Sequence, residues 1–254
     1  MELQATLDRL AECGPLKTWS VIVTILGDLL DEGQRIDGRL LRALTGPMGI
    51  SDEALRVALH RLRRDGWIDT ERRGREAAHG LSERGRAETE AVRSTIYARQ
   101  APPTGPLTLA VLPPEASVPD IASVLLLSQR SVIVAGPLPT GIGEALTAPV
   151  ETGGLPGWIA DMAAPPPLRA AYGALAQAAE TALAAPPPEA LTDRTVLRLS
   201  VFHQWRRLRL RHGPLPDALL PPDWEGARAR DAVMRTLDRF PRPEMAKLSE
   251  AAAS

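Results

Sequence analysis

Residues 51–66 constrain the fold more than any other segment, because their residue types mark the start, the end and both faces of a helix. Ser51 is a good N-cap, two acids follow it where the helix dipole favours them, and a glycine ends the helix. Leu55, Leu59 and Leu62 recur at helical spacing, so they share one face, which must be buried. The opposite arc is mostly basic and carries Arg56, Val57, His60, Arg61 and Arg64.

The segments around this helix predict a compact helical unit closed by a hairpin. Asp37 and Ser82 can cap further helices, and the short segments between Gly66 and Ser82 have strand character. The predicted elements are helices over 16–30, 37–44, 51–65 and 82–97, and strands over 67–71 and 77–81. The order helix, helix, helix, strand, turn, strand, helix is typical of a winged helix-turn-helix.

An arginine-rich turn, Arg72-Arg73-Gly74-Arg75, joins the two predicted strands, where a wing would reach phosphates or the minor groove. The segment from Arg56 to Arg86 contains nine arginines and five acidic residues. Arginine can bond guanine bidentately in the major groove. A solvated helix face beside a charged turn would explain the helix alone, but the whole arrangement favours DNA binding. The predicted contact residues are Ser51, Arg56, His60, Arg61, Arg64, Arg72, Arg73 and Arg75.

Charge and proline divide the chain into three parts. The first hundred residues are rich in charges of both signs, the middle is nearly uncharged and proline-rich, and arginine returns from Leu191 onward. We expect a winged helix-turn-helix domain with a linker helix over 1–100, a small central domain over 101–165 and a helical domain over 166–254. The net charge of −1 excludes a uniformly basic nucleic-acid coat but leaves room for a local basic patch.

The central part predicts a small α/β domain. A strand over 107–112, a helix over 121–129 and a strand over 131–135 would form a βαβ unit, half of a reduced ferredoxin-like domain. Residues 136–157 are expected to be mostly loop, with a turn at Gly141-Ile142-Gly143. Together with the helices on either side, this gives a mostly α, α+β fold class.

The last part predicts three helices, over 168–184, 192–211 and 223–240. The middle helix has two apolar stripes, one through Val201 and Trp205 and the other through Leu199 and Phe202. A helix that is apolar on two sides packs between two partners. It is therefore a candidate dimer interface, as is the helix after Glu83, although burial within one chain would also explain it.

The sequence shows no signature of an enzyme or of a metal site. A single cysteine, Cys13, excludes an intramolecular disulfide framework and a Cys-based metal site, and it fits the reducing cytosol. The four histidines lie in different predicted elements, and no nucleophile elbow, phosphate loop or CxxC occurs. We expect no catalytic residue, no cofactor, no metal, no signal peptide and no membrane span.

Two ordered sets of motifs resemble a known family. The first set is Trp19–Leu30, Gly49–Ser51, Ala54–Leu59, Arg61–Trp67, Arg72–Arg75 and Leu81–Gly85. The second set is Phe202–Arg207, Pro214–Pro216 and Leu219–Gly226. Together they resemble the PaaX-type bacterial transcriptional regulators, over roughly residues 15–97 and 190–240.

The resemblance implies a cytoplasmic homodimer that represses catabolic genes at double-stranded operator DNA, which we expect to be an inverted repeat. It also implies release by an acyl-CoA or aryl-CoA effector. Arginines suit its phosphates and aromatic residues suit its acyl group. The candidate effector residues are Phe202, His203, Trp205, Arg206, Arg207 and Trp224.

The chain departs from the family in its short, proline-rich middle. Related endoribonuclease-like domains use an acid at the end of their first strand, but here Pro113-Pro114 follows that strand and Glu115 lies beyond. This argues against an enzyme. Two other classes stay open: a winged-helix adaptor that binds protein, and a nucleic-acid-processing enzyme that uses the central domain.

Overall fold

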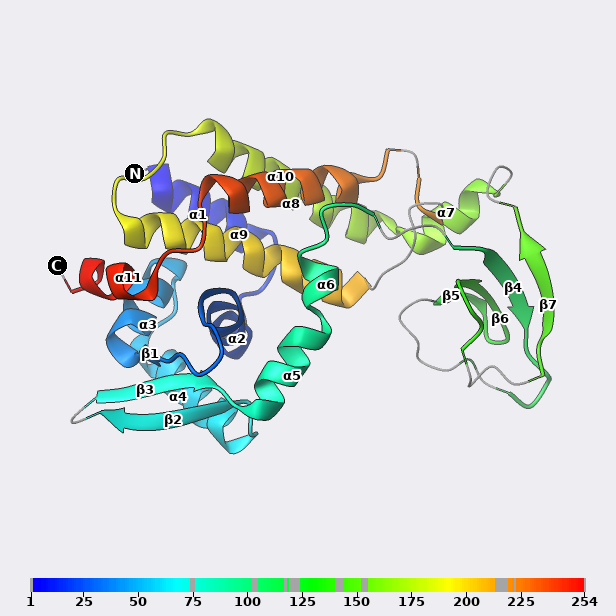
Figure 1. Cartoon of the computed structure of the whole chain (residues 1–254). Coiled ribbons are helices and arrows are strands. Elements are labelled where there is room, and N and C mark those ends of the chain that lie inside the picture. Colours follow the sequence, from blue (N-terminus) through cyan, green and yellow to red (C-terminus); the bar gives the residue numbers. More distant parts are fainter. Residues whose placement is uncertain are drawn as a thin grey trace.

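The computed structural model describes residues 2–73, 76–101, 105–116, 118, 124–139, 144–151, 155–212, 219–221 and 223–253. Figure 1 shows a helical body with a smaller sheet at one side of it. One long helix, α9 (Leu191–His212), runs through the middle of the helical body. The fold is α-rich with two small antiparallel sheets, as expected for an α+β protein.

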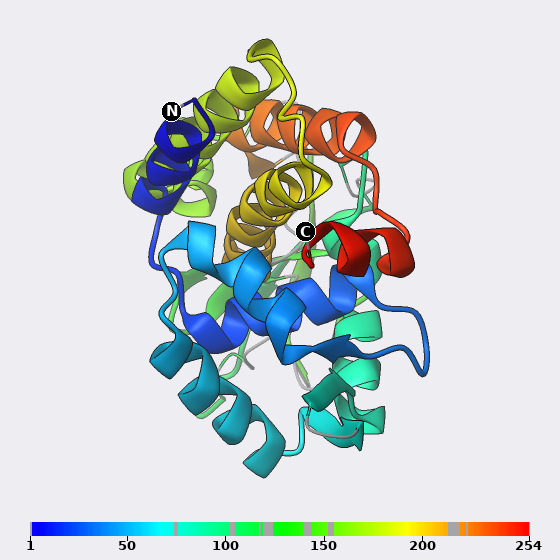
Figure 2. The ribbon, with the colours of Figure 1, turned by 90° about the vertical axis from the view of Figure 1, so that its left-hand side faces the viewer.

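Most of residues 18–91 form the lower part of the body in both Figure 1 and Figure 2, whereas residues 2–12 lie in its upper part. The helices are α1 (Glu2–Glu12), α2 (Thr18–Leu29), α3 (Gly38–Thr45), α4 (Asp52–Arg64), α5 (Glu83–Ala91) and α6 (Arg93–Ile96), with a 3-10 turn at Gly46–Met48. The strands are β1 (Ile36–Asp37), β2 (Ile68–Arg73) and β3 (Glu76–Leu81). They form an antiparallel sheet in the order β1-β3-β2, with Ile68 opposite Leu81.

Side-chain caps begin three of these helices as predicted. Carboxylate oxygen Oδ1 of Asp37 accepts from the backbone N–H of Leu40 at 2.7 Å. The hydroxyl oxygens of Ser51 and Ser82 each accept from the backbone N–H of the residue three positions later, at 3.2 and 3.0 Å. The predicted helix over 82–97 is wrong in one respect: a turn at Val92 (φ −100°, ψ −4°) divides it into α5 and α6.

The smaller sheet differs from the prediction. Its strands are β4 (Leu107–Val111), β5 (Val124–Ser128), β6 (Ser131–Ala135) and β7 (Leu146–Val150), in the order β5-β6-β4-β7. All neighbouring pairs are antiparallel. The predicted βαβ unit is wrong in its elements, because the segment assigned to its helix contains β5, and β6 pairs antiparallel with both β4 and β5. The strand order and the antiparallel pairing are nevertheless those of a ferredoxin-like sheet, in which β6 lies between β4 and β5, so the ferredoxin-like domain stays a prediction.

Two element predictions in this region are corrected. The helix predicted over 121–129 is a strand over 124–128, because this short apolar run pairs with β6 through a tight hairpin. The loop predicted over 136–157 contains edge strand β7, whose small residues show no clear alternation of apolar and polar types. The turn predicted at residues 141–143 lies outside the described residues.

The remaining helices surround α9. They are α7 (Gly157–Ala163), α8 (Pro166–Ala184), α10 (Glu225–Arg239) and α11 (Met245–Ala251). Alanines such as Ala176 and Ala179 are fully buried on α8 and let it approach α10 closely. Helix α9 contacts α1, α2 and α3 as well as α8 and α10, so the two-sided apolar pattern is explained by burial within one chain.

None of the described helices is both long and apolar enough to cross a membrane.

Candidate nucleic-acid interface

Helix α4 has the two faces that its sequence predicts. Leu55 and Leu62 are buried, together with Ala58, and the helix packs on α2. Leu59, predicted to be buried, is only partly so. The other face is open to solvent: even the apolar Val57 is 59% exposed. Beside it lie the exposed side chains of Arg56, His60, Arg61 and Arg64.

Among the described residues, the acids that pair with the arginines of this face lie on or next to the same helix. Arg56 contacts Glu53 at 2.6 Å, and Arg61 and Arg64 contact Asp65 at 3.5 and 3.0 Å. Hydrogen bonds from Arg64 and then Arg61 hold the pKa of Asp65 below its usual value. Exposed pairs of this kind are weak, so the guanidinium groups can exchange them for phosphates or base edges.

The β2–β3 hairpin lies at the same end of the molecule as α4, the lower end in Figures 1 and 2. Arg72 is exposed on β2. For Arg73 the structure describes the backbone alone, and Arg75 lies outside the described residues, so their predicted DNA contacts stay predictions. Ser51 is exposed at the start of α4, where its oxygen caps the helix. A helix N-terminus of this kind suits a phosphate.

Two basic residues next to this face were missed by sequence reasoning. Arg39 and Arg42 of α3 line a hollow of about 450 Å³, together with Arg56 of α4 and His79 of β3. Their spacing of three residues on a capped helix is the signal that could have found them. The Arg39 guanidinium also donates to the carbonyl oxygen of Ala253 at 2.8 Å, so the end of the chain reaches the basic region.

The candidate effector residues on α9 serve mainly as packing. Phe202 and Trp205 are buried: the Phe202 ring lies 4.7 Å from the Tyr97 ring, and Trp205 Nε1 donates to the Ile96 carbonyl oxygen at 2.7 Å. Trp224, also buried, contacts the Tyr172 ring with 4.9 Å between centroids. Trp205 also contacts the Tyr172 ring, with 6.0 Å between centroids, so the two tryptophans share one neighbour and Phe202 packs on another.

The polar residues of the candidate effector set also make contacts with other parts of the protein. His203 is buried against Thr24, with 3.0 Å between Nδ1 and Oγ1. Arg207 donates to the carbonyl oxygen of Cys13 at 2.7 Å. Burial lowers the pKa of Arg206, which lies beside Phe202 in a small hollow near α2. An effector site made by all six residues therefore stays a prediction.

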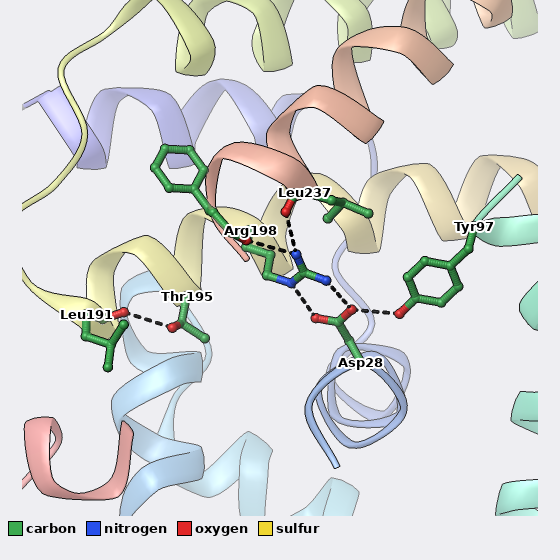
Figure 3. Close-up of polar contacts among 7 residues, drawn as sticks. Asp28, Tyr97, Leu191, Thr195, Arg198 and Leu237 are labelled. Carbon is green, nitrogen blue, oxygen red and sulfur yellow. Dashed lines mark hydrogen bonds and ion pairs between the residues drawn. The ribbon is translucent and has the colours of Figure 1, made fainter. Parts of the chain in front are cut away.

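A buried ion pair joins the first hundred residues to the helices that follow (Figure 3). The Asp28 carboxylate of α2 accepts hydrogen bonds from the Arg198 guanidinium of α9 and from the hydroxyl of Tyr97, the residue after α6. Arg198 also donates to the carbonyl oxygens of Leu237 and Phe240 at 3.0 and 2.9 Å. Burial, followed by the charge of Asp28, raises the pKa of Tyr97 well above its usual value. The network links α2, which packs against α4, to α9 and to the end of α10.

The described part of the chain contains no group of three or more His, Cys, Asp or Glu side chains that could hold a metal ion.

Comparisons with known proteins match both halves of the helical body. The profile of a family described as PaaX-like protein matches residues 17–85, and that of the PaaX-like protein C-terminal domain matches residues 167–247. The transcriptional repressor PaaX of Escherichia coli is 26% identical over 267 residues, covering 93% of this chain and 84% of the repressor.

A solved structure, the uncharacterized protein Rv0674 from Mycobacterium tuberculosis, resembles the fold with a TM-score of 0.50. The match covers 94% of this chain and all of that chain at 20% identity. At this identity the likeness concerns the fold alone.

Proposed function

The chain belongs to the PaaX-like protein family, and on this premise we propose that it is a DNA-binding transcriptional repressor and not an enzyme. The observation that carries the proposal is the exposed basic face of α4 beside the β2–β3 hairpin. Both lie within the residues that the first family profile matches. The 26% identical relative is itself a transcriptional repressor, which supports the same function.

In this proposal residues 1–100 act as a winged helix-turn-helix domain. Helix α4 enters the major groove, and its exposed arginines read base edges. The hairpin follows the backbone as the wing, and Ser51, Arg39 and Arg42 bind phosphates. The β4–β7 sheet within 101–165 and the helices of 166–254 form two further domains that carry assembly and regulation.

The repressor acts as a homodimer on an inverted repeat, because one winged helix covers too few base pairs to define a genomic site. An acyl-CoA or aryl-CoA effector lowers its DNA affinity. Release requires that the effector prefer the state that does not bind DNA. A hundredfold preference corresponds to about 2.7 kcal/mol of coupling.

The test is fluorescence anisotropy with DNA from upstream of the protein's own gene, at several salt concentrations. Replacing Arg72, Arg73 and Arg75 together with Gln should weaken binding to all sequences. The slope of log affinity against log salt should fall by about 0.9 for each phosphate that the variant no longer neutralises. Replacing Arg228 and Arg235 of α10, at the opposite end of the body, is the matched control. A parent protein that binds no DNA would indicate a protein-binding adaptor instead.

A further inference from the structure

A groove of about 400 Å³ lies where three separate parts of the chain meet. The end of α2 and the loop after it form one side, and α5 with the start of α6 forms another. The third contribution is Arg242, from the segment after α10. The volume falls in the range of small-molecule sites.

Part of the groove is lined by small or apolar residues. Gly27 and Leu30 come from the end of α2, Leu81 ends β3, and Ala87 lies on α5. Gly27 allows α5 to lie close to α2, since a Cβ at this position would be 2.7 Å from Cγ2 of Thr89. This lining suits the apolar body of a ligand.

Four arginines, Arg35, Arg86, Arg93 and Arg242, also line the groove, against three acids, Asp31, Glu32 and Glu90. Two of the arginines are firmly paired. Arg242 contacts Asp31 at 2.8 Å, and Arg35 contacts Glu71 of β2 at 3.0 Å.

Arg86 and Arg93 are held less firmly by acids. Their carboxylate contacts, to Glu32 and Glu90, are both 4.0 Å long, and these two acids are 88% and 73% exposed. Arg93 otherwise lies over the Tyr97 ring, 5.2 Å from its centroid. Both guanidinium groups thus have N–H donors available for a stronger acceptor.

Arg86 lies on α5 and Arg93 begins α6, and both line the same groove. We propose that this groove binds a small organic anion, with its apolar body on Leu30 and Leu81 and its carboxylate or phosphate held by Arg86 and Arg93.

Arg86 and Arg35 connect the groove to the hairpin. Arg86 Nη1 donates to the carbonyl oxygen of Leu81 at 2.8 Å, and the partner of Arg35 lies on β2. An anion that draws the Arg86 guanidinium toward itself weakens its bond to the Leu81 carbonyl oxygen and so changes how the end of the hairpin is held. Ligand and DNA affinities are then reciprocally coupled. This last step rests on the proposed function, whereas binding in the groove does not.

Titration calorimetry with benzoate and with phenyl phosphate tests the site, with benzyl alcohol as the neutral control. We expect heat from at least one anion and none from the alcohol. The double replacement Arg86→Gln with Arg93→Gln should weaken binding at least tenfold. The matched control, Arg228→Gln with Arg235→Gln on α10, should leave it unchanged. The anion that binds better identifies the carboxylate or the phosphate as the preferred group.

Absence of heat from both anions, or equal affinities of the parent and the groove variant, would overturn the proposal. Circular dichroism and thermal unfolding check that the groove variant folds, and Arg93→Lys, which keeps the charge, should bind better than Arg93→Gln. DNA binding is measured on the same proteins with and without each anion. Anion binding without DNA binding would overturn the proposed function and leave the site standing, and the reverse pattern would overturn the site alone.

Discussion

Arg198 of α9 binds both carboxylate oxygens of Asp28 of α2, at 2.8 and 2.9 Å, in the interior of the protein. The side chains are 7% and 1% exposed. The remaining guanidinium nitrogen donates to the carbonyl oxygens of Leu237 and Phe240. A desolvated charge needs this degree of pairing, because an unpaired buried charge is strongly unfavourable. The pair therefore fixes α9 and the end of α10 to the helix beneath the basic face.

Arg198→Met should lower the free energy of unfolding by about 3–5 kcal/mol, because it leaves the Asp28 carboxylate buried without its cation. Urea denaturation measures the change. The double variant Arg198→Met with Asp28→Leu should be less destabilised than the sum of the two single variants, because neither charge remains. A single variant as stable as the parent would contradict this account.

Acid should destabilise the protein partly through His203. Its Nδ1 faces the hydroxyl of Thr24, which donates to the Ser20 carbonyl oxygen, so Nδ1 carries the ring proton. Burial, followed by the charges of Arg206 and Arg207, lowers the pKa of His203 to about 4. The unfolded chain has a pKa of about 6.5 at this residue and takes up the proton first.

The contribution of His203 to the free energy of unfolding is therefore fully present above about pH 6.5. It decreases as the pH drops toward 4, by up to about 3 kcal/mol. Burial also lowers the pKa of His79 and of His212, so part of the acid sensitivity has other sources. Urea denaturation of the parent and of His203→Gln at neutral and at acid pH separates them. A variant that loses as much stability in acid as the parent would exclude this role of His203.

Local chemistry made much of the N-terminal part predictable. Asp37, Ser51 and Ser82 each cap their helix by a bond to a backbone N–H three residues ahead, so the evidence for each helix start lies within one turn. The two faces of α4 follow from its spacing in the same way. The winged-helix interpretation uses these elements and does not depend on distant contacts.

Distant contacts decided what the sequence could not predict. The run Val124–Ser128 is short and apolar, a pattern that periodicity alone cannot assign to helix or strand, and pairing with β6 decides it. Nothing local marks Asp28 as the partner of Arg198, 170 residues later. Phe202 and Trp224 suggested one pocket because both are aromatic and near in sequence, yet they pack on different neighbours.

Gly85 should tolerate no side chain. A Cβ at this position of α5 would lie 2.1 Å from the carbonyl oxygen of Trp67, which accepts the backbone N–H of Ser82 at 3.1 Å. Gly85→Ala should lower the free energy of unfolding by about 1–3 kcal/mol, because the hairpin and α5 must move apart. Gly46→Ala is the control: it has αR geometry and nothing within 4 Å of the added Cβ. Equal stability of the two variants in urea would refute the close approach.

Light scattering should give twice the 27.3 kDa mass of one chain at micromolar concentration. Helix α9, one of the two candidate interfaces, is buried by its own chain, so the proposed dimer would need another surface, and the exposed side of α5 remains a candidate. A monomer with and without DNA would rule out a dimeric repressor.

Arg56 and His60 should determine base preference and leave general affinity for DNA largely intact. Both are exposed on α4, one turn apart, on the face that the proposed complex turns toward the major groove. Arg56→Gln or His60→Ala should reduce discrimination between DNA bases by about 1–3 kcal/mol for each base that the variant no longer reads. Arg72→Gln should instead weaken binding to all DNA sequences alike. Selection of bound sequences from a randomised DNA pool, at fixed salt, distinguishes the two effects. If the Arg56 and His60 variants selected the same sequences as the parent, α4 would not be the element that reads the bases, even in a protein that binds DNA.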